Sequence, residues 1–565
     1  MKKVKYEIND DIPSEEFALA HQDENIHDSK FETRPVGWLE DSFKRFVKNK
    51  ASVVGAFIIL FIALFAIIAP IASPDFDSVS STDLAVFETV LPKSHLFNGT
   101  GFWDGTKQET LQESTYKFAQ FDESNHQKYK VLKTKGSAAV TLPNGTVLVE
   151  ASTSYVVKED TYAVGIKEVK VTAEFLKKLE NYEQTKGISM ADNEENAHKS
   201  ILKPIININE YVKEGGEFEN WLNAQVGNGW ENGKDTSNML DKIKNYYNQN
   251  QSVYYKIVPV KRNGNYVDTA FEPLLDEEGN CIPLYVTDTN GNYRFTKEEG
   301  TQTEYTIRVD FYDYFTYKYG FEPLFIFGTN LYGQDIFTRL AKGARFSLLL
   351  GIGISFINFI IGLIWGAVSG YYGGKVDLMM ERVTDIISNV PTIIIMTIAQ
   401  IQLTNNYDLK AKLGSGGVII LAILIAFVYN GWVGVASTTR MQFYRFKGQE
   451  YVLASRTLGA KDRRLIFKHI LPNAVGTLVT SSVLMIPSVI FSESSLSYLG
   501  IINFQTSGIC SVGALLDEGQ KANIADFPHV LLFPAILISL LMISFNLFGN
   551  GLRDAFNTTL RGSEK

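Results

Sequence analysis

The sequence predicts an all-α polytopic membrane bundle of six transmembrane helices that carries a large inserted extracellular α+β domain. Six stretches of about 20 largely apolar residues are each long enough to cross a bilayer. A long polar segment separates the first stretch from the other five and alternates between strand-like runs and turns. The overall composition, 45% hydrophobic and 21% charged over 565 residues, resembles a soluble protein only because it averages these two regions.

The elements follow from the N-terminus. Residues 1–51 have little apolar periodicity and predict a cytoplasmic tail that is partly disordered. The first apolar stretch, residues 52–72, lies too far from the start for an ordinary cleaved signal and predicts the first transmembrane helix. Residues 338–565 predict a five-helix core, with spans at 346–368, 378–401, 418–435, 474–496 and 530–552. We expect kinks in these helices at Pro391, Pro487 and Pro534.

The basic residues predict which side of the membrane each loop faces. Lysine and arginine gather before the first span, in the loop 440–473 and after the last span, and such loops mark the cytoplasmic side. Both termini are therefore expected in the cytoplasm, and residues 73–337 outside the cell. Arg339, Lys342 and Arg345 disagree, because they would lie outside, just before the second span. Reversing that span would carry the most basic loop outside, so the assignment stands.

The polar insert, residues 73–337, predicts the extracellular α+β domain. Residues 129–157 predict a hairpin that turns at Asn144-Gly145, and residues 284–295 predict another that turns at Asn290-Gly291. Short helices are expected at 177–184 and 238–249. The aromatic segment 309–325 is interpreted as the core of a strand, with contact to a peptide or a binding protein as the alternative.

The basic loop at 440–473 predicts two short helices joined at a glycine. Glu450 falls in the first turn of the first helix, where a carboxylate suits the helix dipole. Gly459 suits the left-handed position that ends it. The second helix is expected to run from about Asp462 and to stop at Leu471-Pro472, because proline disfavours helix in the residue before it. On this pattern alone, an amphipathic element lying on anionic lipid headgroups is equally open. One face of the second helix carries Leu465, Ile466 and His469.

The stretch EYVLASRTLGAKDRRLIFKHILPNA resembles the "EAA" loop in the membrane subunits of binding-protein-dependent ABC importers. Ala454 and Ser455 match its two small residues, and Leu471-Pro472 matches its end. Leu453 departs from the pattern's glutamate, and Glu450 lies about one turn earlier. In that family the loop seats in a groove of a cytoplasmic ATPase and transmits its closure to the membrane helices. The resemblance implies that five residues carry ATPase coupling: Glu450, Ala454, Gly459, Leu465 and His469.

Other stretches resemble the C-type membrane subunit of oligopeptide, dipeptide and nickel importers. They are residues 43–74, 327–352, 366–391, 492–500 and 545–562, in the family's order. Asn330 and Gln334 replace an Asp and an Arg of the family pattern, and the large insert is the main departure. The resemblance implies a plasma or inner membrane permease subunit that forms half of a translocation pathway for peptides. Nickel or another small solute is the alternative cargo.

The resemblance also implies the partners. They are a homologous sibling permease, two ABC ATPase subunits and an extracellular substrate-binding lipoprotein, besides membrane lipid. The chain has no phosphate-binding P-loop, since its nearest match places Val376 after Lys375. No bound cofactor and no catalytic residue are therefore expected, with ATP and Mg²⁺ used by the partner ATPases. The net charge of −8 gives no reason to expect nucleic acid.

Polar residues inside spans either line the translocation path or form hydrogen bonds between helices. Glu493 is expected at the outer gate or at a pairing contact. The histidines show no metal-ligand spacing, and Cys281 and Cys510 are expected as unpaired thiols, with a disulfide between them as the alternative. A membrane sensor and a membrane-tethered enzyme remain the competing classes. The candidate path residues are Asn358, Asp385, Asn389 and Glu493, with Asn430 and Asn546 as further polar positions.

Overall fold

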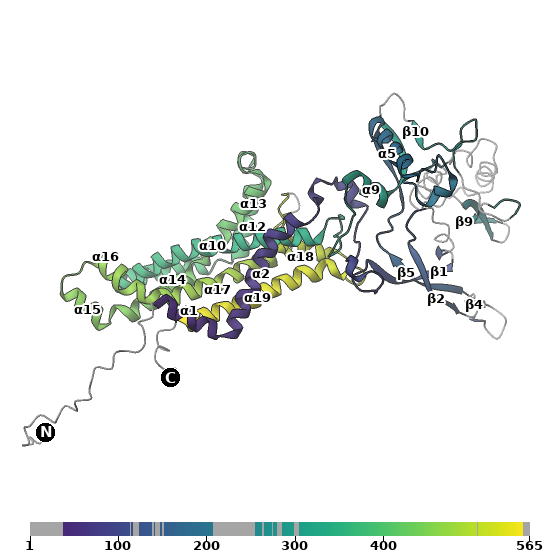
Figure 1. Ribbon diagram of the computed structural model, residues 1–565. Helices are drawn as coiled ribbons and strands as arrows, with labels where there is room; N and C mark the ends of the chain where they lie inside the picture. The colour runs from purple at the N-terminus through teal and green to yellow at the C-terminus, as the bar shows by residue number, and fades with distance from the viewer. Residues whose placement is uncertain are drawn as a thin grey trace, which may run out of the picture.

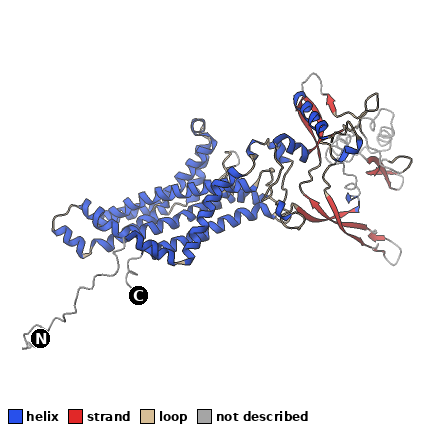
Figure 2. Cartoon of the chain, in the orientation of Figure 1, coloured by secondary structure: helices blue, strands red, loops and turns tan. Residues whose placement is uncertain are grey.

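The computed structural model places a bundle of long helices at one end of the molecule and strands at the other (Figures 1 and 2). It describes residues 38–113, 115–116, 124–137, 140–141, 147–149, 152–206, 255–262, 265–273, 275–278, 285–298, 304–504 and 507–556. The expected disordered tail, the helix expected at 238–249 and Cys281 with its pairing therefore lie wholly or almost wholly outside the described residues.

The described helices fall into three groups: those before the strands, those among them and those of the bundle. In chain order they are α1 (Trp38–Lys48), α2 (Lys50–Ala72), η2 (Phe76–Ser78), α3 (Ser81–Ala85), η3 (His95–Phe97), α5 (Ala173–Lys186), η4 (Glu194–His198), α9 (Phe311–Tyr319), α10 (Ile336–Tyr372), α11 (Gly374–Ser388), α12 (Thr392–Thr404), α13 (Tyr407–Gly431), α14 (Val433–Lys447), α15 (Glu450–Thr457), α16 (Asp462–Arg464), the π-helix η5 (Leu465–Ile470), α17 (Leu471–Tyr498), α18 (Val512–Lys521) and α19 (Pro528–Phe556).

The predicted membrane bundle is confirmed. Within the described residues, five helical segments are long and apolar enough to cross a membrane: α2, α10, α13 with α14, the run from α16 through α17, and α19. The remaining predicted span, 378–401, is a broken pair, α11 and α12, bent by 68°. Pro391 precedes α12 and has no N–H to continue the helix, which confirms the kink predicted there. Helices α17 and α19 continue through Pro487 and Pro534.

Small residues allow the bundle helices to approach closely. Gly362 and Gly366 of α10 lie against α14, where an added Cβ at Gly366 would stand 2.2 Å from the carbonyl oxygen of Ala436. Gly55 of α2 faces the backbone of α19 in the same way. Glycine and other small residues are the usual means of helix association in lipid, because apolar side chains gain nothing by leaving it.

The strands form two sheets and two separate hairpins between α2 and α10. One sheet has the order β1–β5–β2, and the other has β10–β11–β6 with β7 paired to β11; all pairs are antiparallel. The described strands are β1 (Thr106–Gln112), β2 (Tyr129–Ser137), β3 (Val140–Thr141), β4 (Val147–Val149), β5 (Ser152–Asp160), β6 (Ile166–Thr172), β7 (Leu202–Lys203), β8 (Tyr255–Arg262), β9 (Asn265–Pro273), β10 (Thr296–Glu298) and β11 (Glu304–Asp310).

Both predicted hairpins are present. β2 pairs with β5, and β3 pairs with β4, as the first prediction requires, while the predicted turn at Asn144-Gly145 lies outside the described residues. In the second, Thr287 bridges Tyr293, and Gly291 adopts φ +87° between them. The helix predicted at 177–184 is the centre of α5.

The aromatic segment 309–325 was wrongly assigned to a strand beyond Asp310. Asp310 ends β11 and is the N-cap of helix α9, because its side chain accepts the N–H of Asp313. Gly320 ends that helix at φ +76°. The assignment to a core is correct, because Phe311 and Phe315 are buried among Phe87 and Phe325. A polar N-cap and a terminal glycine outweighed the β propensity of the aromatic residues.

Candidate functional site

The loop at residues 440–473, for which the resemblance implies ATPase coupling and which we call the coupling loop, lies at the end of the bundle farthest from the strands (Figure 1). Its first helix, α15, begins at Glu450, as predicted. Gly459 follows it with φ +81°, which confirms the predicted left-handed position. The N–H groups of Gly459 and Ala460 donate to carbonyls of the preceding helix and close the turn. The loop is thus a defined helix–turn–helix.

A small apolar core holds the loop against the bundle. Val452 of α15 and Leu465 of η5 are fully buried with Tyr371 of α10 and Phe443 of α14. The Tyr371 hydroxyl also donates to Asp462 at 2.5 Å. Leu465 therefore fixes the position of the loop from inside it, and its side chain offers no surface to another protein.

Polar contacts join the two arms of the loop. Ser455 Oγ lies 3.4 Å from His469 Nε2, and the amide of Asn473 donates to the Tyr451 hydroxyl at 3.0 Å. His469 is therefore half-buried between the arms. Glu450, Ala454 and Gly459 are exposed.

The loop also exposes apolar side chains that were not among the predicted coupling residues. Leu458 at the turn is 88% exposed and Phe467 is 60% exposed. Arg463, Arg464 and Lys468 are exposed around them. The residue before a helix-ending glycine is an identifiable sequence signal for the tip, but only the fold shows that Leu458 lies outside the loop's core.

The second helix of the loop does not stop at Leu471-Pro472, so that prediction was wrong. The chain passes from α16 through the π-helix η5 directly into α17, giving one helical run of 37 residues, Asp462–Tyr498. Pro472 occupies the first turn of α17, where its missing N–H is tolerated, and the wider π turn precedes it. The second helix of the coupling loop and the fifth predicted span are consequently one continuous helix.

A cavity of about 690 Å³ opens between α10, α12, the α13–α14 pair and α17. Asn358 of α10 lines it, as expected of a path residue, and its amide donates to the Phe427 carbonyl at 3.1 Å. None of the described residues that line it is ionisable. Its polar lining consists of amides and hydroxyls: Asn358, Thr392, Asn430, Thr438, Ser481, Ser488, Ser492 and Ser495.

Of the other polar candidates, Asn430 also lines this cavity and the remaining ones lie outside it. Asp385 and Asn389 are exposed on α11, where Asp385 pairs with Arg382 at 3.2 Å and the Asn389 amide donates to a backbone carbonyl. Asn546 is exposed on α19 and also donates to a carbonyl of its own helix. Glu493 is fully buried among serine hydroxyls, with Ser497 at 3.1 Å and Ser347 at 3.4 Å. Its surroundings are contacts between helices of this chain.

Ion pairs at the opposite end of the bundle account for two of the three basic residues that disagreed with the predicted topology, Arg339 and Lys342. Arg339 pairs with the buried carboxylate of Glu518 at 2.5 Å, and Lys342 pairs with Asp77. Asn330, which departs from the family pattern, donates its amide to Glu518 at 2.7 Å. These basic groups are therefore neutralised by partners on the same side of the bundle.

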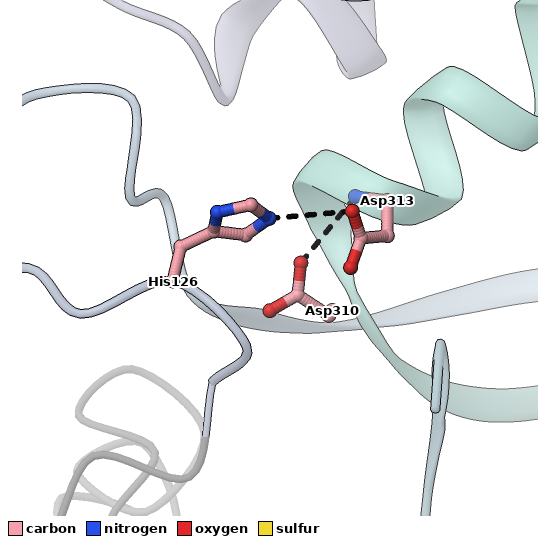
Figure 3. A group of neighbouring side chains, drawn as sticks. All are labelled: His126, Asp310 and Asp313. Atoms are coloured by element: carbon pink, nitrogen blue, oxygen red, sulfur yellow. Dashed lines mark hydrogen bonds and ion pairs between the residues drawn. The ribbon is translucent and has the colours of Figure 1, made fainter. Parts of the chain in front are cut away.

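Among the residues that the structure describes, one group of potential metal ligands comes together that sequence spacing missed: His126, Asp310 and Asp313, with ligand atoms within 4.8 Å of one another (Figure 3). Their charges already compensate each other, because His126 pairs with Asp313 at 3.2 Å. Asn125 donates to both aspartates. Charge attraction and hydrogen bonds that hold the start of α9 account for this arrangement without a metal ion.

Comparisons with known proteins cover the bundle on both sides of the insert. Residues 359–562 match the family "Binding-protein-dependent transport system inner membrane component", and residues 37–85 match "N-terminal TM domain of oligopeptide transport permease C". The chain is 39% identical over 235 residues to the oligopeptide transport system permease protein OppC of Bacillus subtilis. That alignment covers 42% of this chain and 72% of OppC.

Other relatives carry different names. The chain is 39% identical to the dipeptide transport system permease protein DppC of Bacillus subtilis, over 42% of this chain and 69% of DppC. It is 33% identical to the glutathione transport system permease protein GsiD of Escherichia coli, over 45% of this chain and 78% of GsiD. A solved structure of the MetNI methionine ABC transporter is similar over 38% of this chain and 95% of its own, at 16% identity and a TM-score of 0.30. A score that low supports no argument.

Proposed function

This chain belongs to the family of inner membrane permease subunits of binding-protein-dependent ABC importers, in its oligopeptide and dipeptide C-type branch, and we propose that it forms half of a peptide translocation pathway. The observation that carries the proposal is the match to permease models on both sides of the insert. As a permease, the chain is a transport component, and the proposal assigns ATP hydrolysis with Mg²⁺ to separate ATPase subunits.

The continuous helix supplies the mechanism that we propose. The run from Asp462 to Tyr498 begins in the coupling loop and ends in the bundle, where Ser481 and Ser495 line the cavity. A force on the loop therefore acts directly on one wall of the cavity. The buried contact of Leu465 with Phe443 transmits the same displacement to α14, a second wall. ATPase closure would thus move two walls together and change which side of the membrane the cavity opens to.

The chemistry of the cavity favours a peptide as cargo. Its amide and hydroxyl groups can exchange hydrogen bonds with peptide backbone of any sequence, and its apolar wall accepts side chains. Because its described lining is neutral, the cavity does not discriminate against the charged amino or carboxyl terminus of a cargo peptide. Nickel is less well suited, since the cavity presents no histidine, cysteine or carboxylate to a metal ion. Glutathione, itself a peptide, fits the same cavity chemistry.

The arrangement in the membrane follows from the same proposal. The coupling loop and α1 lie at one end of the bundle and the strands at the other (Figure 1). With basic loops inside the cell, both termini are cytoplasmic and the domain between α2 and α10 is extracellular. A sibling permease would close the second half of the path, two ATPases would bind the coupling loops, and a substrate-binding lipoprotein would deliver cargo from outside.

Replacing Gly459 tests coupling. At φ +81° a β-branched side chain is strained by about 1–3 kcal/mol, so Gly459→Val should leave the protein inserted but uncouple peptide uptake from ATP hydrolysis in proteoliposomes that hold the complete importer. Gly448→Ala is the matched control, because Gly448 lies in the same loop at φ −90° with open space around it. Wild-type uptake by Gly459→Val at equal protein level would contradict the proposal.

The cargo is tested in the same proteoliposomes. Uptake of a labelled tripeptide should be competed by other short peptides irrespective of their net charge, and not by nickel chelates. Competition by the chelates alone would reject peptide as the cargo while leaving the coupling result intact.

A further inference from the structure

The segment that contains η3 and leads to β1 exposes apolar side chains beside the spans. We call residues 94–103, sequence SHLFNGTGFW, the aromatic loop. Leu96 is 89% exposed, Phe102 is 63% exposed and Phe97 is 40% exposed. Exposed apolar groups that lie together on a protein surface indicate an interaction site.

The loop has a defined conformation. Gly99 and Gly101 each adopt φ +78°, and Trp103 adopts φ +56°, an uncommon value for a bulky residue. The buried carboxylate of Asp104 accepts the N–H of Gly101 at 2.9 Å and pairs with Lys158 at 2.7 Å. A strained conformation that its surroundings hold in this way is typical of a functional segment.

A chain of aromatic contacts connects the loop to the spans. Phe97 contacts Phe102, and Phe102 contacts Trp103, with ring centroids 5.9 and 5.4 Å apart. Trp103 contacts Phe533 of α19 at 5.5 Å. Beyond it, Phe327 stacks on Phe533, and Phe337 of α10 joins Phe327 to Phe65 of α2. The loop is thus packed against the outer turns of the helices that cross the membrane.

The position along α19 sets the depth of the loop. Phe533 lies five residues after Pro528, the first residue of α19, which corresponds to about 8 Å along the helix axis. The neighbouring α19 side chains Leu532 and Ile536 are 52% and 45% exposed, and Ile71 near the end of α2 is 80% exposed. These apolar side chains belong to the lipid-facing surface of the two spans, and the aromatic loop continues that surface.

We propose that the aromatic loop anchors the inserted domain in the lipid bilayer. Leu96, Phe97 and Phe102 enter the boundary between headgroups and acyl chains, and Trp103 connects them to α19. Tryptophan is enriched at this depth because it combines an apolar ring with a polar N–H, and the Trp103 indole N–H donates to the Ile326 carbonyl. The wholly apolar side chains of Leu96, Phe97 and Phe102 gain by leaving water. The anchor is separate from the transport function, and the proposal applies on whichever side of the membrane the domain lies.

Site-specific fluorescence tests the anchor on the full chain in lipid nanodiscs. An environment-sensitive label is attached to Leu96→Cys or Phe102→Cys in a C281S/C510S background that inserts normally. We expect blue-shifted emission, quenching by brominated phospholipid and protection from aqueous iodide. The matched control is Lys177→Cys on α5, an exposed position of the same domain that should show iodide quenching and no bromolipid quenching. Iodide quenching at 96 and 102 equal to that at 177 would overturn the proposal.

Unlabelled protein provides a second measurement. Amide hydrogen exchange of residues 94–103 in nanodiscs should be slow in the wild type and faster in a Leu96→Ser/Phe102→Ser variant, while exchange in α5 is unchanged. Equal exchange in both proteins would reject the anchor. Slow exchange that needs added substrate-binding protein would assign the loop to a protein interface and equally reject a lipid anchor.

Discussion

Asn330 shows how one atom changes the chemistry of a buried position. Its amide donates to Glu518 and its carbonyl accepts the N–H groups of Tyr332 and Gln334. An aspartate could accept the same two N–H groups but could not donate to Glu518. With Arg339 as the partner of Glu518 at 2.5 Å, a second carboxylate would leave the cluster with one buried negative charge in excess.

We therefore expect Asn330→Asp to destabilise the protein by about 1–3 kcal/mol, since the buried Glu518 carboxylate loses the amide that donates to it and gains a second negative charge beside it. The measurement is the Tm of the purified permease in detergent. Gln334→Glu is the control, because it adds the same charge four residues on but keeps the oxygen that accepts from the Asn330 amide at 3.2 Å. A Tm loss as large for the control would mean that charge alone, and not the lost donor, is responsible.

At the scale of elements, one residue of the coupling loop holds the loop in position and another is exposed for contact with a partner. Leu465 lies in the loop's own core and Leu458 lies exposed at its tip, although both are leucines within eight residues. The family resemblance assigned Leu465 a role in ATPase coupling without saying how the side chain acts. The packing of η5 against α14 and α10 places that side chain inside the loop, so it can act only by holding and moving the helices.

The two leucines make a matched pair of variants. Leu465→Ala should lower stability by about 2–5 kcal/mol, the usual range for a buried leucine, and should lower ATPase binding because the loop loses its position. Leu458→Ala should leave the Tm unchanged and still weaken ATPase binding in a pull-down from membranes. Normal ATPase binding by Leu458→Ala would show that the tip is not part of the contact.

The start of α9 depends on the protonation of His126. The hydrogen bond to Asp313 raises the pKa of His126 above its usual range, and Asp310 and Asp160 act in the same direction, although burial opposes them. A pKa raised by folding stabilises the folded state fully below about pH 6.5, the unfolded value, and the stabilisation is lost as pH rises through the folded pKa.

We expect α9 to open more readily at pH 8.5 than at pH 6. The readout is amide exchange of residues 311–319, corrected for its intrinsic pH dependence. His126→Gln, which keeps a donor and cannot be protonated, should abolish the difference. A difference that persists in this variant would assign the pH sensitivity to another group.

At the scale of the whole molecule, the inserted domain is fastened to the bundle and does not hang on a linker. The strand-like segments at its two ends lie together, since the Lys93 N–H donates to the Phe325 carbonyl at 3.0 Å and Val90 exchanges hydrogen bonds with Thr329. Aromatic contacts from Trp103 to Phe533 add a second attachment. We propose that this attached domain docks or caps the substrate-binding protein over the translocation path.

Deleting the domain tests that role. Because Lys93 and Phe325 are adjacent, residues 94–324 can be replaced by two glycines, with Phe87→Ser to remove the apolar side chain that the deletion exposes. We expect normal insertion and ATPase binding, weaker affinity for the substrate-binding protein and slower peptide uptake. Unchanged affinity and uptake would show that the domain does not act in docking.

The sequence by itself determined the membrane bundle, the helix–glycine–helix of the coupling loop and the hairpins, because apolar length, turn residues and capping residues act locally. It could not determine that Leu465 is buried, that Asn358 reaches a cavity which Asp385 and Asn389 do not, or that Arg339 and Lys342 are neutralised. Those facts depend on residues brought together from distant parts of the chain. Only the tertiary structure decided them, together with the helix that continues past Pro472, since a π turn and packing there outweigh a local preference.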